Sequence, residues 1–274
     1  MNPSELGHAP LGREVNYPTA YDASLLFPIE RSHNRAQLPL QPQWSGNDIW
    51  TAWEISWLNN RGKPVVAVGL FDVPHNSPRL IESKSFKLYL NSFNESRFAS
   101  AEQVQALFEH DLSAAAQAAV GVKLLSLDDA ALAQCRALPG ENIDHADIEC
   151  SVYTPAPQLL KCVDAAALVS ETLTSDLLKS NCPVTGQPDW GSVQVQYRGP
   201  QIDRHALLQY IVSLRHHTEF HEHCVEKMYC DIWQACQPEF LCVYARYTRR
   251  GGLDINPWRS SAPVETPIWR TPRQ

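Results

Sequence analysis

Cys182 lies in a short stretch of turn-forming residues, Asn181–Gly191, with Asp189 seven positions later. Two prolines and a glycine between them disfavour helix and strand, so we expect an ordered loop, where binding and catalytic groups are often found. A thiol becomes nucleophilic as thiolate, and a nearby carboxylate can take the proton and later return it. Because the charge of a carboxylate disfavours a resting thiolate, we predict that Asp189 shuttles protons. The alternative is that Cys182 is a small buried hydrophobic residue and Asp189 a turn cap.

A second group of reactive side chains lies in "RHHTEFHEHCVEKMYC", at the start of an expected helix. His217 and His221 share a helical face, and Cys224 lies one turn further on, so a zinc site has to be considered, although neither CxxC nor HExxH is present. His221 and Glu222 offer another use, because a carboxylate accepts hydrogen bonds from the ring NH and exocyclic amine of a guanine-like base. An exposed Glu222 beside a half-buried histidine explains the pattern equally well.

Two further stretches could meet a phosphorylated ligand. "IESKSFKLYLNSF" alternates in chemistry as a half-solvated strand does, and "RYTRRGGLDINPWRS" places Arg249 and Arg250 before two glycines. Such a turn lets backbone and guanidinium approach a phosphate, although a basic surface turn is nearly as good an explanation. No GxGxxG follows an expected strand, so the patterning predicts no dinucleotide-binding Rossmann unit.

The elements that must position these residues follow one plan twice. In each half the patterning predicts strands, then helices, then a strand, as apolar residues alternate or recur at helical spacing. The expected strands are 63–74, 83–93, 120–127, 192–200 and 240–250, and the expected helices are 100–119, opened by a capping box of Ser100 and Gln103, 207–214 and 225–232. We therefore predict a loop-rich segment 1–50, a first unit 51–155 and a second unit 156–274, with a loose boundary near Pro155.

Composition excludes several classes of protein. The net charge is -7, from 23 Lys plus Arg against 30 Asp plus Glu, which does not favour a nucleic-acid partner. No apolar run is long enough to cross a membrane, and the N-terminal residues are too polar for a signal peptide, so we expect a cytoplasmic protein. Its 8 cysteines show no framework spacing and are expected to be thiols.

Taken together, four segments resemble the 7-cyano-7-deazaguanine reductases of queuosine biosynthesis, in their long, two-unit form. The matching segments are "ESKSFKLYLNSF", "LLKSNCPVTGQPDWG", "FHEHCVEKMYCDIW" and "YARYTRRGGLDINPWRS", in that order, and the resemblance covers nearly the whole chain. It implies an α+β tunnelling fold (T-fold) of two tandem ββααββ units with antiparallel sheets and helices on one face, and a homodimer. It also implies reduction of the nitrile of 7-cyano-7-deazaguanine to a primary amine by two NADPH, with no metal.

The resemblance also implies roles for particular residues. Cys182 would form a covalent thioimide with the nitrile, Asp189 would donate protons, and His221 would be a second acid. The positions expected to bind the base are Ile81, Glu82, Ser83, His221 and Glu222, and those expected to hold NADPH are Ser83, Lys84, Arg250 and Gly251.

Two other classes stay open at this point. A zinc-dependent cyclohydrolase on the same fold would use Cys182 or Cys224 with histidines as ligands and would lose activity to chelators. A non-catalytic pterin- or purine-binding module would keep Glu222 but be indifferent to Cys182→Ala. The resemblance assigns no role to His223, Cys224, Cys230 and Cys236.

Overall fold

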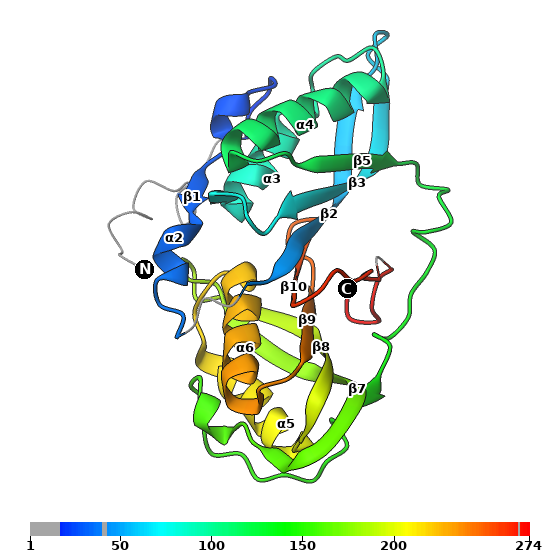
Figure 1. The fold of residues 1–274 in the computed structure, drawn as a ribbon. Helices are drawn as coiled ribbons and strands as arrows, with labels where there is room; N and C mark the ends of the chain where they lie inside the picture. Colours follow the sequence, from blue (N-terminus) through cyan, green and yellow to red (C-terminus); the bar gives the residue numbers. More distant parts are fainter. Residues whose placement is uncertain (1–16, 40–42, 268) are drawn as a thin grey trace. The chain divides into compact units, whose positions relative to one another are not determined.

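The computed structural model describes residues 17–39, 43–267 and 269–274 of the chain (Figure 1). Its internal contacts divide the chain into two compact units, each built from several segments. Unit 1 contains residues 1–36, 48–133 and 249–255, and unit 2 contains residues 37–47, 134–248 and 256–274. The division differs from the continuous segments 51–155 and 156–274 expected from the sequence, because the start of a C-terminal strand belongs to unit 1.

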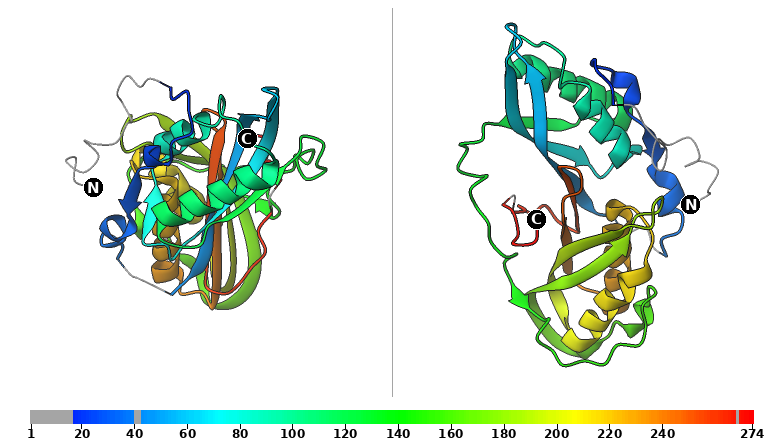
Figure 2. Two further views of the ribbon diagram at one scale, coloured as in Figure 1. Left: turned by 90° about the horizontal axis from the view of Figure 1, so that it is seen from above. Right: turned by 180° about the vertical axis from the view of Figure 1, so that it is seen from behind.

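Unit 1 combines antiparallel strands with two main helices. Strands β5 (Gly121–Leu125), β3 (Pro64–Pro74) and β2 (Ser45–Leu58) are neighbours in that order, and β1 (Pro28–Glu30) pairs with β4 (Arg79–Ile81). Helices α3 (Ser83–Asn91) and α4 (Ala101–Ala116) cover one face of the sheet (Figures 1 and 2). Their aromatic side chains, among them Phe86, Tyr89 and Phe108, pack against Trp50 and Phe71 of the strands.

The expected strand 83–93 is wrong, because most of this segment is helix α3. Alternation of Phe86, Leu88 and Leu90 suggested a strand, but Tyr89 and Phe93 are also fully buried, so the apolar face follows helical spacing from Phe86. Glu82 is the N-cap: its carboxylate accepts from Lys84 N at 2.8 Å and Ser85 N at 2.7 Å. Glutamate is not among the preferred N-cap residues, so the start of the helix carried little sequence signal.

Other predictions in this half are confirmed. Ser100 Oγ accepts from Gln103 N at 3.3 Å at the start of α4, and Gln103 Oε1 accepts from Ala99 N at 2.9 Å, so the predicted capping box is present with its return bond displaced by one residue. The described part of 1–50 is partly loop, but it also contains η1 (Ala23–Leu25), β1, α2 (Arg31–Arg35) and the start of β2. Residues 1–16 and 40–42 lie outside the described residues.

Unit 2 is an antiparallel sheet covered by two helices on one face. Its strands lie in the order β10 (Leu253–Ser260), β9 (Phe240–Tyr247), β8 (Pro188–Ile202), β7 (Cys162–Asn181) and β6 (Glu141–Asn142), with only the short β6–β7 pair parallel. The remaining elements are η2 (Pro157–Leu159), α5 (Arg204–Ser213), η3 (Leu214–His216) and α6 (His221–Cys236). The predicted strands 192–200 and 240–250 and the two predicted helices are confirmed, apart from their ends.

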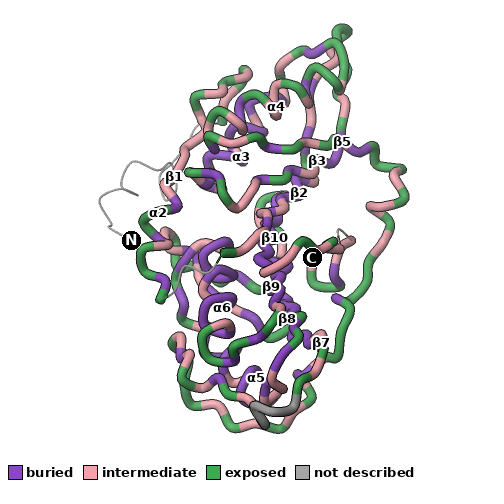
Figure 3. The backbone as a smooth tube through the Cα atoms, in the orientation of Figure 1, coloured by how far each residue is buried: buried purple, intermediate pink, exposed green. Residues whose placement is uncertain are grey.

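The core of unit 2 lies between its helices and its sheet. Figure 3 shows α6 and β9 buried along most of their length. Val193, Val195 and Tyr197 of β8 point into this core, so the alternate residues of β8 lie on the opposite face of the sheet. The fold is therefore mixed α+β with antiparallel sheets. Within the described residues, no helix has both the length and the apolar character needed to span a bilayer.

Candidate active site

Cys182 begins the tight loop that joins β7 to β8 in unit 2. Its backbone N donates to Gln187 O at 2.9 Å, and its carbonyl accepts from Gly186 N at 3.0 Å. Gly186 has a φ of +69°, a left-handed conformation that glycine adopts without strain. Thr185 Oγ1 adds a side-chain bond within the loop, accepting from Gln187 N at 3.3 Å. The Cys182 side chain is buried, with 6% of the residue exposed.

Asp189 lies at the same end of this hairpin and faces the helices. It pairs with Ser180 across the β7–β8 ladder and is buried. His221, the first residue of α6, places its Nε2 3.4 Å from Asp189 Oδ2. The structure therefore brings together two of the predicted catalytic residues, a carboxylate and an imidazole. They lie at the end of the hairpin where the loop that begins with Cys182 is located.

The imidazole of His221 is held flat by an aromatic ring that the sequence analysis did not single out. Tyr247, at the end of β9, stacks on His221 with ring centroids 3.8 Å apart and an angle of 6° between the planes. Gly191 leaves room beside this ring, because a Cβ at that position would make a tight contact of 3.1 Å with Tyr247 Cδ1. His221 Nδ1 is buried without a hydrogen-bond partner among the described residues, so one ring nitrogen is left for a group from outside the chain.

The start of α6 is tied to the end of β7. Asn181 N donates to His217 O at 2.8 Å, and Glu219 N donates to Asn181 O at 3.1 Å, so the segment before His221 lies alongside the residue before Cys182. The Asn181 amide also donates to Arg215 O at 3.1 Å. These bonds hold the end of β7 beside the segment before α6, and they therefore keep Cys182 and His221 in the same region of unit 2.

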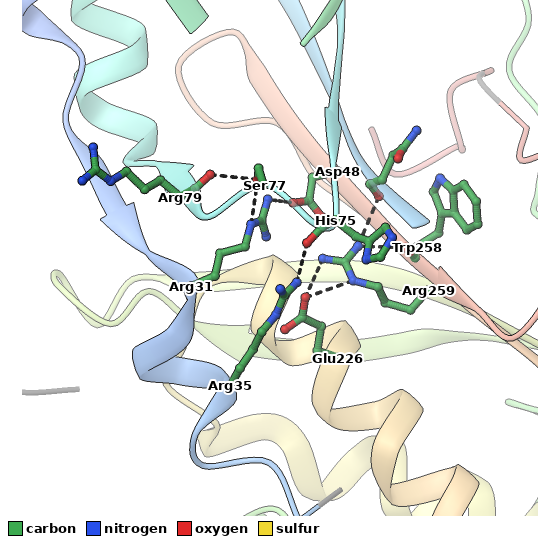
Figure 4. A network of polar contacts seen from close by, with 10 residues as sticks. Arg31, Arg35, Asp48, His75, Ser77, Arg79, Glu226, Trp258 and Arg259 are labelled. Carbon is green, nitrogen blue, oxygen red and sulfur yellow. Dashed lines mark hydrogen bonds and ion pairs between the residues drawn. The ribbon is translucent and has the colours of Figure 1, made fainter. Parts of the chain in front are cut away.

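A buried ion pair of Arg259 and Glu226 lies one turn after Glu222 along α6 (Figure 4). Arg259 of β10 donates to Glu226 Oε1 from Nε at 3.0 Å and from Nη2 at 2.7 Å, and both side chains are almost fully buried. A two-pronged contact of this kind holds helix and strand in one register. Glu222 is itself only 3% exposed, so its carboxylate is not a surface charge.

The neighbouring histidines and cysteines differ in character from this group. Burial, together with the nearby His223 and Lys227, lowers the pKa of His217 to about 4, so its imidazole is neutral at pH 7. Burial raises the pKa of Cys224, Cys230 and Cys236 to about 12, which keeps these thiols protonated and unreactive. Among the described residues, no three His, Cys, Asp or Glu side chains form a group that could hold a metal ion.

The remaining predicted residues lie in unit 1. Ile81 ends β4 and is buried, and Glu82 is fully buried with its carboxylate bonded to the first backbone N–H groups of α3. Ser83 and Lys84 are the first residues of that helix. Because Glu82 already occupies the helix N-terminus, an anion approaching α3 would meet side chains rather than these N–H groups.

Arg250 and Gly251 lie in the tight turn that leads into β10. Arg250 N and Leu253 O form a hydrogen bond of 2.9 Å, and Gly251 and Gly252 have φ values of +58° and +76°. A pocket of about 240 Å³ opens beside this turn. Its lining residues are Tyr17, Ala52, Glu54, Lys87, Leu90, Asn91, Asn94, Gly251, Gly252 and Leu253.

Lys87 is a candidate binding residue that the sequence analysis left without a role. A Cβ at Gly251 would touch the Lys87 stem at 3.4 Å, so the lysine lies directly over the glycine turn. In helix α3, Lys87 lies one turn after Lys84, so the two lysines lie on the same face. In the predicted strand 83–93 they would lie on opposite faces, so the strand pattern does not connect them.

Comparison with known proteins gives a consistent family. A family model described as "Nitrile reductase, 7-cyano-7-deazaguanine-reductase N-term" matches residues 17–124, and a second, "QueF-like protein", matches residues 188–265. A solved archaeosine synthase, QueF-Like in the apo form, aligns with a TM-score of 0.31 and 20% identity over 37% of this chain and 100% of that chain. That likeness is too distant to support an argument.

Curated relatives match almost end to end. The chain is 56% identical to a protein from Bordetella avium over 96% of both chains, and 56% identical to one from Bordetella pertussis over 98% of this chain and 99% of the relative. It is 55% identical to a protein from Verminephrobacter eiseniae over 100% of both chains. Each of the three relatives is named an NADPH-dependent 7-cyano-7-deazaguanine reductase.

Proposed function

The chain belongs to the family of 7-cyano-7-deazaguanine reductases, and from this premise we propose that Cys182 is the nucleophile that attacks the nitrile. The reaction is the NADPH-dependent reduction of the nitrile of 7-cyano-7-deazaguanine to a primary amine. The observation that carries the proposal is the contact between His221 Nε2 and Asp189 Oδ2 at the hairpin end from which Cys182 starts.

The chemistry requires a nucleophile because a nitrile is a poor hydride acceptor. Asp189 takes the proton of the Cys182 thiol, the sulfur bonds to the nitrile carbon, and the proton passes to the nitrile nitrogen. The product is a thioimide, whose polarised C=N bond accepts a hydride on carbon and a proton on nitrogen. The resulting C–S bond then breaks, which releases an imine and restores the thiol with one proton.

The imine is reduced in the same way, so one nitrile consumes two hydrides and two protons. NADPH supplies both hydrides when it is bound. His221 is the second acid in this scheme, since its Nε2 lies next to Asp189 and its ring is fixed by Tyr247. Burial of the site strengthens these proton transfers, because little water competes for the same groups.

Glu222 and the residues before α3 would bind the base. Glu222 is a buried carboxylate next to His221, which suits the ring NH and exocyclic amine of a deazaguanine. The backbone of Ile81 and Ser83 and the carboxylate of Glu82 are the matching positions in unit 1. Since Glu82 caps α3, its bond to a base would use lone pairs that the two backbone N–H groups leave over.

The residues of unit 1 also fit NADPH in their chemistry. Lys84, Lys87 and Arg250 carry positive charge, and the two glycines after Arg250 keep the turn without side chains. We assign the phosphates to Lys84, Lys87 and Arg250, with Ser83 and Gly251 as further contacts. Arg250→Ala should raise the KM for NADPH severalfold and leave substrate affinity unchanged; an unaltered KM would remove Arg250 from the cofactor site.

The family also suggests the assembly. The order of strands and helices in unit 2, ββααββ, supports the tunnelling fold, and we propose that the chain works as a homodimer with no nucleic acid bound. Sedimentation of the purified protein at several concentrations tests the dimer, and a monomer at micromolar concentration would contradict it.

Intact-protein mass spectrometry tests the nucleophile. Wild type mixed with 7-cyano-7-deazaguanine in the absence of NADPH should gain the full mass of the nitrile, and the gain should disappear when NADPH is added. Cys182→Ala should show no gain while still binding the base, and Cys224→Ala is the matched control, since that thiol is buried and protonated. An adduct in Cys182→Ala would place the nucleophile elsewhere.

A further inference from the structure

The C-terminal residues after β10 lie on the face of the unit 2 sheet opposite its helices (Figures 1 and 2). Their contacts are with the strand residues whose side chains point away from the core. Tyr244 Oη donates to Pro267 O at 2.8 Å, and Arg246 Nη1 donates to the same oxygen at 3.0 Å. This segment is therefore bound directly behind the strands that carry Asp189 and Tyr247.

Gln274 uses both atoms of its amide in this contact. Its Nε2 donates to Tyr247 O and to Asn256 Oδ1, each at 2.9 Å. Its Oε1 accepts from Arg246 Nε at 3.0 Å and from Thr271 N at 3.1 Å. An amide bonded to four partners is held in one orientation, so Gln274 can fix the position of the backbone that it contacts.

The backbone of Tyr247 depends on these side-chain amides. The pairing of β9 with β10 runs from Cys242 to Tyr244, before Tyr247 is reached. At Tyr247 the N–H donates to Asn256 Oδ1 at 3.1 Å and the carbonyl accepts from Gln274. Asn256 and Gln274 are bonded to each other, so on the β10 side of Tyr247 these two side chains take the place of a paired strand residue.

Arg273 makes the corresponding contact on the next strand. Its Nη1 lies 3.3 Å from Gly191 O and also donates to Asp176 O, and its guanidinium lies 5.8 Å from the centre of the Trp190 ring. Trp190 directly follows Asp189, and Gly191 is the cross-strand partner of Tyr247. Two adjacent residues thus hold one strand pair from behind, one on each strand.

We propose that Arg273 and Gln274 position the catalytic pair Asp189 and His221, with Gln274 acting through Tyr247. The Tyr247 ring lies 3.8 Å from the His221 ring, so a shift of the Tyr247 backbone moves the plane on which His221 rests. Asp189 and Trp190 share a backbone, so Arg273 constrains the carboxylate in the same way. The inference rests on the proposed roles of Asp189 and His221 and adds two residues that touch no reactant.

The test compares Gln274→Ala with Gln274→Glu. The alanine removes all the side-chain bonds of Gln274, whereas the glutamate can still accept from Arg246 but cannot donate to Tyr247 O or Asn256 Oδ1. If Gln274 positions Tyr247, both variants should lose about tenfold in kcat, because misplacement of a catalytic group by a fraction of an ångström is costly. The KM for NADPH should stay within about twofold in both, since its proposed contacts lie elsewhere.

A merely structural role gives a different pattern. If Gln274 only anchors Arg246, Gln274→Glu should restore both the melting temperature and kcat, and that rescue would overturn the proposal. Wild-type kcat per folded molecule in both variants would overturn it as well, as would the failure of both to fold. Gln209→Ala is the matched control. The Gln209 amide, on the exposed side of α5, donates one hydrogen bond, to Glu149 O, and its removal should leave kcat unchanged.

The same assay separates this inference from the function on which it rests. Wild type must reduce the nitrile and form the adduct, and Cys182→Ala must do neither. If wild type fails, the proposed function is wrong whatever the Gln274 variants do. If wild type and Cys182→Ala behave as expected while the Gln274 variants match wild type, only the positioning role is lost.

Discussion

The hairpin loop of unit 1 and the hairpin loop of unit 2 close through a similar pair of backbone bonds but differ in length by one residue and in the first side chain. In unit 1, Asn59 N donates to Lys63 O at 2.9 Å and Asn59 O accepts from Gly62 N at 2.9 Å. In unit 2 the equivalent bonds run from Cys182 N to Gln187 O and from Gly186 N to Cys182 O, across a loop that is one residue longer. Cys182 and Asn59 therefore occupy corresponding positions in the two units.

The side chain at this position decides what the loop can do. Asn59 Oδ1 accepts from Arg61 N at 2.9 Å and from Lys63 N at 3.0 Å. The asparagine side chain therefore stabilises its own turn. A thiol is a poor acceptor and cannot take this role. In the loop of unit 2, Thr185 Oγ1 instead accepts from Gln187 N, so the turn does not need its first side chain as a cap. This difference fits the covalent role proposed for Cys182.

The helices of the two units correspond in the same way. Tyr89 of α3 donates to Asp111 of α4 at 2.7 Å, and Tyr210 of α5 donates to Asp231 of α6 at 2.6 Å. Both helix pairs end in a left-handed glutamine, Gln117 or Gln237. The Tyr–Asp bond between the helices and the left-handed glutamine are thus present in both units. Two differences between the units lie in the hairpin loop and at the start of the second helix.

Exchanging the first loop residue gives the largest expected effect. Cys182→Asn introduces the residue that unit 1 carries, so turnover and the covalent adduct should both be lost, by about 10⁴-fold or more for a nucleophile. The melting temperature should be equal to wild type or higher, because the introduced asparagine could cap the turn as Asn59 does. Activity assays and calorimetry check this; retained turnover would show that the two loops do not differ in the way described.

The second helix offers a matched pair of carboxylates. Glu222 and Glu102 are both the second residue of their helix, but Glu222 is buried and Glu102 is exposed. Glu222→Gln should weaken binding of the nitrile base by about 10- to 100-fold, the cost of 1–3 kcal/mol for an unpaired buried group. Glu102→Gln should change nothing by calorimetric titration, and equal losses of base and NADPH affinity in Glu222→Gln would contradict its assignment to the base.

We also expect unit 2 to contribute a loss of folding stability at low pH. His217 corresponds to Ser96, since each carbonyl accepts from the end of the first strand of its hairpin. Burial lowers the pKa of His217 to about 4 from 6.5, so the unfolded chain takes up a proton below pH 6.5 that the folded chain refuses. Stability is therefore lost as the pH falls from 6.5 towards 4, by about 2 kcal/mol between pH 7.5 and pH 5.

Urea unfolding of wild type and His217→Ser at these two pH values measures this component. The variant carries the residue of unit 1 and should lose about 2 kcal/mol less than wild type on acidification. The other titrating groups are the same in both proteins and cancel in the difference. The same pH dependence in both would show that His217 is accessible to protons in the folded state.

The sequence predicted the elements whose apolar period was clear. The helices α4, α5 and α6 and the strands β8 and β9 each show one regular face, and each was found. β7 was missed because its ladder with β8 has register shifts at three places, which break the alternation that marks a strand. Helix α3 differs from the predicted strand because Phe86, Leu88 and Leu90 alternate as in a strand, and its N-cap Glu82 gives little signal for a helix start.

The sequence indicates candidate site residues where a residue type carries the chemistry, and not where a contact depends on the position of a residue in the fold. Cys182, Asp189, His221 and Glu222 were identified from motifs that resemble one family, and the structure places all four in unit 2. Tyr247 and Gln274 had no signal, because nothing in a tyrosine or glutamine alone indicates which backbone or ring it will support. Such contacts are set by strand register, which the local sequence does not contain.

The start of the second helix gives the smallest expected effect and completes the comparison. Ser100 caps α4, whereas Phe220 stands at the N-cap of α6 without a side-chain bond. Ser100→Ala should lower the free energy of unfolding by about 1 kcal/mol and leave kcat unchanged, with Ser126→Ala, an exposed loop hydroxyl, as the control within about 0.5 kcal/mol. Denaturant unfolding measures both.

The size of this loss estimates the stabilisation that α6 lacks. In α6 the first turn carries His221, whose Nε2 lies 3.4 Å from Asp189 Oδ2, and Glu222, the residue proposed to bind the base. If Ser100→Ala costs the expected amount, the proposed placement of catalytic and binding residues at this helix start has a measurable cost in stability. No loss on Ser100→Ala would mean that the cap is replaceable by water, and the uncapped start of α6 would then need no functional explanation.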